Sequence, residues 1–100
     1  MQFKAKARIP QPPASLSPAM RSFWRSITRE FELDPQHYKL LKIACRAWDA
    51  SAEATATLQA EGGYFTDQHG NRKAHPAQHV RTQANKQFIA SMRELGLDGA

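Results

Sequence analysis

Three dipeptides that end in proline divide this chain and limit its fold more than any other feature. Ser17-Pro18, Asp34-Pro35 and His75-Pro76 each place a side chain that can cap a helix directly before a proline. Proline is favoured at the first position of a helix, where its missing N–H costs no hydrogen bond. Glycines at Gly62-Gly63 and at Gly96 supply the matching stop signals. The sequence therefore predicts three helices.

Within each predicted helix, apolar residues recur at spacings of three and four, as one buried helix face requires. The same arc of the second helix carries many small residues, which allow a neighbouring helix to approach closely. For both tryptophans, packing in the core is favoured over stacking on bases. The predicted core contains Phe23, Trp24, Ile27, Leu41, Trp48, Phe88, Met92 and Leu95.

The helical period breaks between the second and third helices. Tyr64, Phe65 and Thr66 favour a strand, and Gly70-Asn71 suits a turn, so a short β-hairpin or a compact loop is expected there. A chain of 100 residues matches one small domain. The predicted fold class is mainly α: a three-helix domain over residues 17–100 with this insert between its second and third helices.

Residues 1–16 precede the first helix and have no helical period. Lys4, Lys6 and Arg8 alternate with small or apolar residues, and three prolines follow them. Proline-rich segments favour extended conformations. We interpret residues 1–16 as a flexible basic arm.

The charge of the chain points to a polyanionic partner. The net charge is +5, and the first 30 residues carry six basic groups against one acidic group. A domain pI above about 9 is typical of nucleic-acid binders, and the pI here is about 9.8. Three arginines repeat every four residues on the polar side of the first helix, and a second basic stripe opens the second helix near Asp49 and Glu53. The predicted DNA-binding residues are Lys4, Lys6, Arg8, Arg21, Arg25, Arg29, Lys39, Lys42 and Arg46.

The sequence offers little for catalysis or metal binding. His75 and His79 have the spacing of a zinc-binding helix, but the glutamate that would act as general base is absent. Cys45 is the only cysteine, which precludes an intramolecular disulfide and suits a reducing compartment. No apolar run approaches the roughly 18 residues of a spanning helix. We expect a soluble intracellular protein with no metal, no cofactor and no catalytic residues.

Two other classes of function are consistent with these residues. The helices could form a protein-interaction or regulatory module in which the positive charge is incidental. His69, Asn71 and His75 also weakly resemble the histidine and asparagine of small HNH-type nucleases. No acidic residue accompanies a histidine at a strand end, so the nuclease ranks lowest.

The order and spacing of several short motifs resemble the small terminase subunit of tailed double-stranded DNA phages and prophages, over roughly residues 10–98. These motifs are Pro12-Pro13, Leu16-Ser17-Pro18, Phe23-Trp24-Arg25, Leu40-Leu41, Ala47-Trp48-Asp49, Tyr64 to Gly70, His75-Pro76 and Arg93-Glu94-Leu95-Gly96-Leu97. The resemblance implies a non-enzymatic subunit that assembles into a ring and binds viral double-stranded DNA. It also implies delivery of that DNA to the large terminase subunit, which holds the ATPase and nuclease, in the cytoplasm of the bacterial host.

Chain length independently favours self-association. A chain of this size buries a modest fraction of its surface when it folds alone. Broad apolar arcs on long helices are then expected to be buried between copies, and closed symmetric assemblies are the common outcome.

Overall fold

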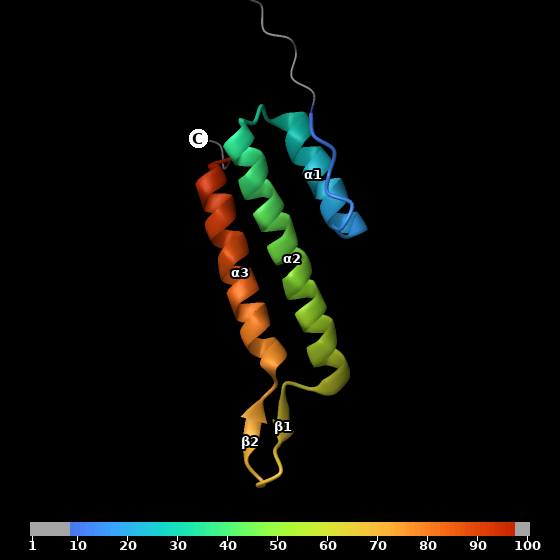
Figure 1. Ribbon diagram of the computed structural model, residues 1–100, viewed down its shortest axis with the longest axis vertical. Coiled ribbons are helices and arrows are strands. Elements are labelled where there is room, and N and C mark those ends of the chain that lie inside the picture. The colour runs from blue at the N-terminus through green and yellow to red at the C-terminus, as the bar shows by residue number, and fades with distance from the viewer. Residues whose placement is uncertain (1–8, 98–100) are drawn as a thin grey trace, which may run out of the picture.

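The computed structural model describes residues 9–97, and these contain three helices and one two-stranded hairpin (Figure 1). The elements are α1 (Pro18–Glu30), α2 (Pro35–Glu61), β1 (Tyr64–Thr66), β2 (Arg72–Ala74) and α3 (Pro76–Leu95). The mainly α fold class is confirmed, and the insert between α2 and α3 is a hairpin. No helix within residues 9–97 is long and apolar enough to cross a membrane.

The two long helices, α2 and α3, run antiparallel and side by side, and α1 lies along the N-terminal half of α2 (Figure 1). The hairpin projects from the other end of the α2–α3 pair. Its strands are antiparallel, with Tyr64 opposite Ala74 and Thr66 opposite Arg72. The molecule therefore has two distinct ends.

The helix boundaries follow from local capping. The Ser17 hydroxyl accepts a hydrogen bond from the N–H of Met20 (3.2 Å), and His75 Nδ1 accepts one from the N–H of Ala77 (3.0 Å). These side chains satisfy N–H groups that have no partner inside the helix. At the C-terminal end of α3, Gly96 takes the left-handed conformation with φ 64°. Glycine adopts that conformation without a steric cost.

Small side chains fill the contact between α2 and α3. On α3 the buried residues Ala77, Ala84 and Ser91 recur every seven positions, and on α2 the buried set includes Ala44 and Ala54. Such side chains let two helix backbones approach closely over a long interface. The α2–α3 pair therefore resembles an antiparallel coiled coil with an alanine-rich seam.

The main apolar cluster lies where all three helices meet. Trp24, Leu41 and Leu95 are buried there together with Leu16, which lies N-terminal to α1. Of the other residues predicted for the core, those that are half-buried are Phe23, Ile27, Phe88 and Met92.

The prediction of a core position is wrong for Trp48, whose side chain is 47% exposed. Its ring packs edge-on against Phe88, with 5.2 Å between ring centroids and an angle of 61° between the ring planes. The alanine-rich seam between α2 and α3 leaves no space for an indole. Trp48 therefore lies at the margin of the seam.

Candidate nucleic-acid interface

The arginines of α1 lie on the side turned away from α3. Phe23 and Ile27 line a groove between α1 and α3, together with Ile89 and Met92. Arg25 and Arg29 follow these two residues by two positions, which is roughly 200° around a helix. Both arginines are exposed.

The third arginine of this series on α1, Arg21, makes hydrogen bonds within the chain. Its Nη1 donates to the carbonyl oxygens of Leu16 (2.6 Å) and Ala14 (3.3 Å). These bonds fix the segment that precedes α1. Arg21 therefore anchors this segment, and Arg25 and Arg29 are the exposed arginines of the series.

The segment before α1 packs against that helix. The indole Nε1 of Trp24 donates to the Pro10 carbonyl (3.0 Å), and Leu16 is 3% exposed. Leu16 thus belongs to the core, although its place among the prolines predicts a position in the basic arm. The three arm cations predicted to bind DNA, Lys4, Lys6 and Arg8, lie outside the described residues.

Asp49 connects the start of α1 to the middle of α2. Its carboxylate accepts hydrogen bonds from the Ser17 N–H (2.8 Å) and from the Ser17 hydroxyl (2.6 Å). A carboxylate at the N-terminus of a helix is also favoured by the helix dipole. Sequence spacing puts Asp49 beside the basic stripe of α2 as a neutralising charge. In the fold this carboxylate instead binds Ser17 at the start of α1.

The basic stripe of α2 lies on the surface. Lys39 and Arg46 are exposed and Lys42 is half-buried. The ion pairs among residues 9–97 join His37 with Asp34, Lys73 with Asp67 and His75 with Glu61, so they include no cation of α1 or of this stripe. Two neighbouring helices therefore present cations without carboxylate partners in the described part of the chain.

The hairpin carries further cations and aromatic side chains, none of which is among the predicted DNA-binding residues. All six strand residues are exposed. The Arg72 guanidinium lies 4.5 Å from the centre of the Tyr64 ring, a cation–π contact. The sequence feature that could have identified this candidate site is the pair of aromatics in one strand and the pair of cations in the other.

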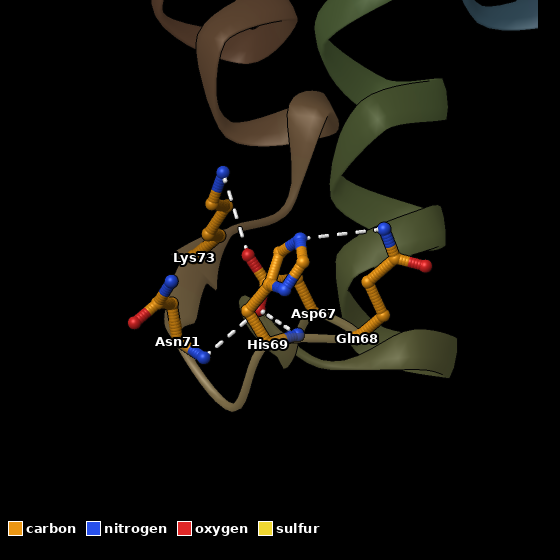
Figure 2. A network of polar contacts seen from close by, with 5 residues as sticks. All are labelled: Asp67, Gln68, His69, Asn71 and Lys73. Carbon is orange, nitrogen blue, oxygen red and sulfur yellow. Dashed lines mark hydrogen bonds and ion pairs between the residues drawn. The ribbon is translucent and has the colours of Figure 1, made fainter.

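Asp67 organises the tip of this hairpin (Figure 2). Its Oδ1 accepts hydrogen bonds from the backbone N–H groups of Asn71 and His69, each 2.9 Å long. Its Oδ2 lies 3.5 Å from Lys73 Nζ. The hydrogen bond from Asn71, with those from His69 and Lys73, lowers the pKa of the Asp67 carboxyl below its ordinary value.

Two histidines of the weak nuclease resemblance, His69 and His75, have polar partners in the structure. His75 Nδ1 accepts from the N–H of Ala77, and its Nε2 lies 2.9 Å from Glu61 Oε1, so His75 ties the start of α3 to the end of α2. The His69 ring is near Gln68, with 3.4 Å between their nitrogen atoms. Within residues 9–97, no group of three histidine, cysteine or acidic residues could hold a metal ion.

Cys45 is fully buried, and burial raises the pKa of its thiol from 9.0 to about 11, with a smaller contribution from the charge of Asp49. We expect the folded protein to resist alkylation by iodoacetamide at neutral pH. Because the unfolded state loses this proton first, the thiol's contribution to stability should be lost as pH rises from 9.0 to about 11.

Denaturant melts across this pH range, compared with those of Cys45→Ala, isolate the thiol from other titrating groups. The wild type should lose more stability than the variant as pH rises. A parallel decline in the two proteins, or rapid alkylation of the native state, would contradict the prediction.

Comparison with known proteins assigns the chain to a family. The family model described as "Phage terminase, small subunit" matches residues 20–100, which include all three helices almost completely and the whole hairpin. Neither the curated proteins nor the solved structures include a significant match. Small terminase subunits are generally non-catalytic. With four-fifths of its length covered by the family model, the chain belongs to the phage terminase small subunit family.

Proposed function

We propose that this chain is the DNA-binding small subunit of a phage terminase. It recognises viral double-stranded DNA and delivers it to the large ATPase and nuclease subunit for packaging into the capsid. Family membership supports this function. The DNA-binding role rests on one observation: among residues 9–97, the cations on the surface of α1 and α2 form no ion pair with a carboxylate.

This surface suits the phosphate backbone of DNA. Arg25 and Arg29 are one helical turn apart, about 6 Å along the axis of α1. Duplex DNA carries one charge per roughly 1.7 Å of its axis, so each arginine can reach a different phosphate. Lys39, Lys42 and Arg46 of the adjacent helix extend the contact. Such contacts position a protein on DNA but carry no sequence information.

The proposed arm adds to the same surface. Lys4, Lys6 and Arg8 supply further phosphate contacts from the N-terminal part of the chain, whereas Leu16 already packs with the helical domain of residues 17–100. Coupling between a basic arm and a folded domain increases affinity without any demand on base sequence.

We further propose that copies of the chain assemble into a ring in the cytoplasm of the bacterial host. Large apolar side chains are exposed on both sides of the α2–α3 pair: Val80 is 48% exposed and Ile89 is 55% exposed. These residues are nine positions apart, which places them on opposite sides of α3 at about 100° per residue. Different faces that pair between copies give a head-to-tail contact, and such contacts close into rings when the rotation permits. Native mass spectrometry should detect a single closed oligomer, and a strictly monomeric protein at micromolar concentration would contradict this assembly.

The DNA-binding surface is tested by the double variant Arg25→Ala/Arg29→Ala. Binding to a mixed-sequence duplex, measured by fluorescence anisotropy over a salt series, should weaken about tenfold. The salt slope should flatten by about 0.9 for each phosphate that the variant no longer neutralises. The matched control is Lys86→Ala/Arg93→Ala, which removes two exposed cations from α3. Circular dichroism should be unchanged in both variants.

Equal losses in the two double variants would show that net charge, and not this surface, determines binding. Unchanged affinity and slope in Arg25→Ala/Arg29→Ala would reject this surface as the DNA site. A wild type that binds no duplex would favour the protein-interaction module.

A further inference from the structure

We propose that the β1–β2 hairpin is a second DNA-contact element, which enters a groove of the duplex and contacts base edges with its tip. The inference rests on the proposed DNA-binding function and adds a base-reading element to it. The residues proposed to bind DNA on α1 and α2 are all cations, and a terminase subunit that recognises viral DNA also needs contacts that distinguish sequences.

The hairpin exposes aromatic side chains that take no part in the core of the single chain. Within residues 9–97 its strands pair only with each other, and Tyr64 and Phe65 are 54% and 44% exposed. The buried residues near this end of the molecule, Ala54, Leu58 and Ala77, all belong to the helices. An isolated two-stranded hairpin is marginally stable in water. A protein that exposes two adjacent aromatics on such an element has them available for a partner.

The shape of the hairpin is nevertheless well defined. At the tip, the Asp67 carboxylate accepts two backbone hydrogen bonds and pairs with Lys73 (Figure 2). At the base, the Gly63 carbonyl accepts hydrogen bonds from the His75 N–H (2.9 Å) and from the Gln78 side chain. An element that is already ordered loses little conformational freedom when it binds.

The distribution of side chains favours a groove over a flat protein surface. Phe65 is paired with Lys73, so these two residues share one face of the hairpin. Tyr64 and Arg72 share the other face, where they form the cation–π contact. Each face therefore has one aromatic and one cation, and neither has a continuous apolar patch. A protein partner would cover one face, whereas the two walls of a DNA groove face both. The major groove, about 12 Å wide, admits a two-stranded ribbon.

The tip has the groups that contact bases. Gln68 and Asn71 are exposed, and their amides can form paired hydrogen bonds with adenine in the major groove. Gly70 lies between them, with φ 83°, and apart from its chain neighbours no atom of the described residues lies within 4 Å of the position that a Cβ would occupy. The backbone can therefore approach DNA closely. Arg72 and Lys73 follow on opposite faces of the hairpin, from which they can contact phosphates on the two sides of the groove.

The hairpin lies far enough from the basic surface of α1 and α2 for the two to be altered independently by mutation. The hairpin projects from the end of the α2–α3 pair opposite the C-terminal end of α1 (Figure 1). Its residues are exposed, so substitutions there should leave the three helices intact. Variants of the hairpin and of α1 can therefore be compared in the same protein.

The first test is Arg72→Ala/Lys73→Ala, with Lys86→Ala/Arg93→Ala as the control of equal charge. Anisotropy with the mixed-sequence duplex should show about tenfold weaker binding for the hairpin variant and a flatter salt slope, beyond any change in the control. Unchanged binding, or a reduction equal to that of the control, would overturn the inference. Intact DNA binding combined with failure to bind the large subunit would also overturn it, in favour of a protein contact.

The second test is Gln68→Ala/Asn71→Ala, which removes the tip amides without a change in charge. Selection from a randomised duplex library, followed by sequencing, should yield a weaker base preference for this variant than for the wild type, at nearly unchanged affinity for the mixed duplex. An identical preference would overturn base reading by the tip. A wild type that binds no duplex would refute the proposed function itself, whereas loss of binding only in the hairpin variants would reject the α1 surface and retain the hairpin.

Discussion

Replacing Trp24 with alanine should lower the free energy of unfolding by about 3–5 kcal/mol, because it removes a large side chain from the core. Trp24 is 3% exposed and packs with Leu16, Met20, Leu41, Cys45 and Leu95. The substitution also leaves the Pro10 carbonyl without its indole donor. Since total stability of a small domain is about 5–15 kcal/mol, this variant should be close to unfolding at physiological temperature.

The matched control is Trp48→Ala, which removes the same side chain from an exposed position. The substitution mainly removes the edge-on packing against Phe88, so the expected cost is about 1 kcal/mol. Urea melts at low protein concentration measure both values. Equal costs would show that Trp48 is buried in the protein as it exists in solution. A cost for Trp48→Ala that increases with protein concentration would place the ring at a contact between copies.

Replacing Asp49 with alanine should lower stability by about 2–3 kcal/mol, because hydrogen bonds to a charged group are stronger than neutral ones. The substitution removes both acceptors of Ser17, so the start of α1 is no longer tied to α2. Asp49→Asn keeps one carbonyl oxygen and should cost less. Thermal melts by circular dichroism give the comparison.

Glu53→Ala is the control, one helical turn further along α2. Glu53 is exposed, and it forms no ion pair among the described residues, so its removal should change stability by less than about 0.5 kcal/mol. A destabilisation by Asp49→Ala no larger than that by Glu53→Ala would mean that the Ser17 hydrogen bonds contribute little. Reduced DNA binding in Asp49→Ala at full helicity would indicate that α1 must be fixed on α2 for the cations to act together.

The local physics of the chain was sufficient to predict the elements. Each helix begins at a proline that follows a capping residue, and Gly62 and Gly96 end α2 and α3. The strands of the hairpin flank Gly70, which has a positive φ. Signals of this kind depend on a few neighbouring residues. They are therefore visible in the sequence without knowledge of the fold.

The candidate interface was only partly predictable for the same reason. Exposure of Arg25 and Arg29 follows from helical spacing, but the bonds of Arg21 to Ala14 and Leu16 depend on how the preceding segment turns back along α1. The cation–π contact between Arg72 and Tyr64 depends on the register of two strands. The register depends on which residues pair across the two strands, and this pairing cannot be read from the order of residues along the chain.

By itself, the sequence determined the number of helices, their starts, the hairpin and the basic character of the surface, because capping, periodicity and charge act over one or two turns. Tertiary structure alone decided that Asp49 holds the start of α1, 32 positions away in the chain at Ser17. It also decided that Trp48 lies at the margin of the fold, since the separation of α2 and α3 is set by alanines on both helices. The period of an apolar stripe shows which side of a helix is inward, but the space available there depends on the partner helix.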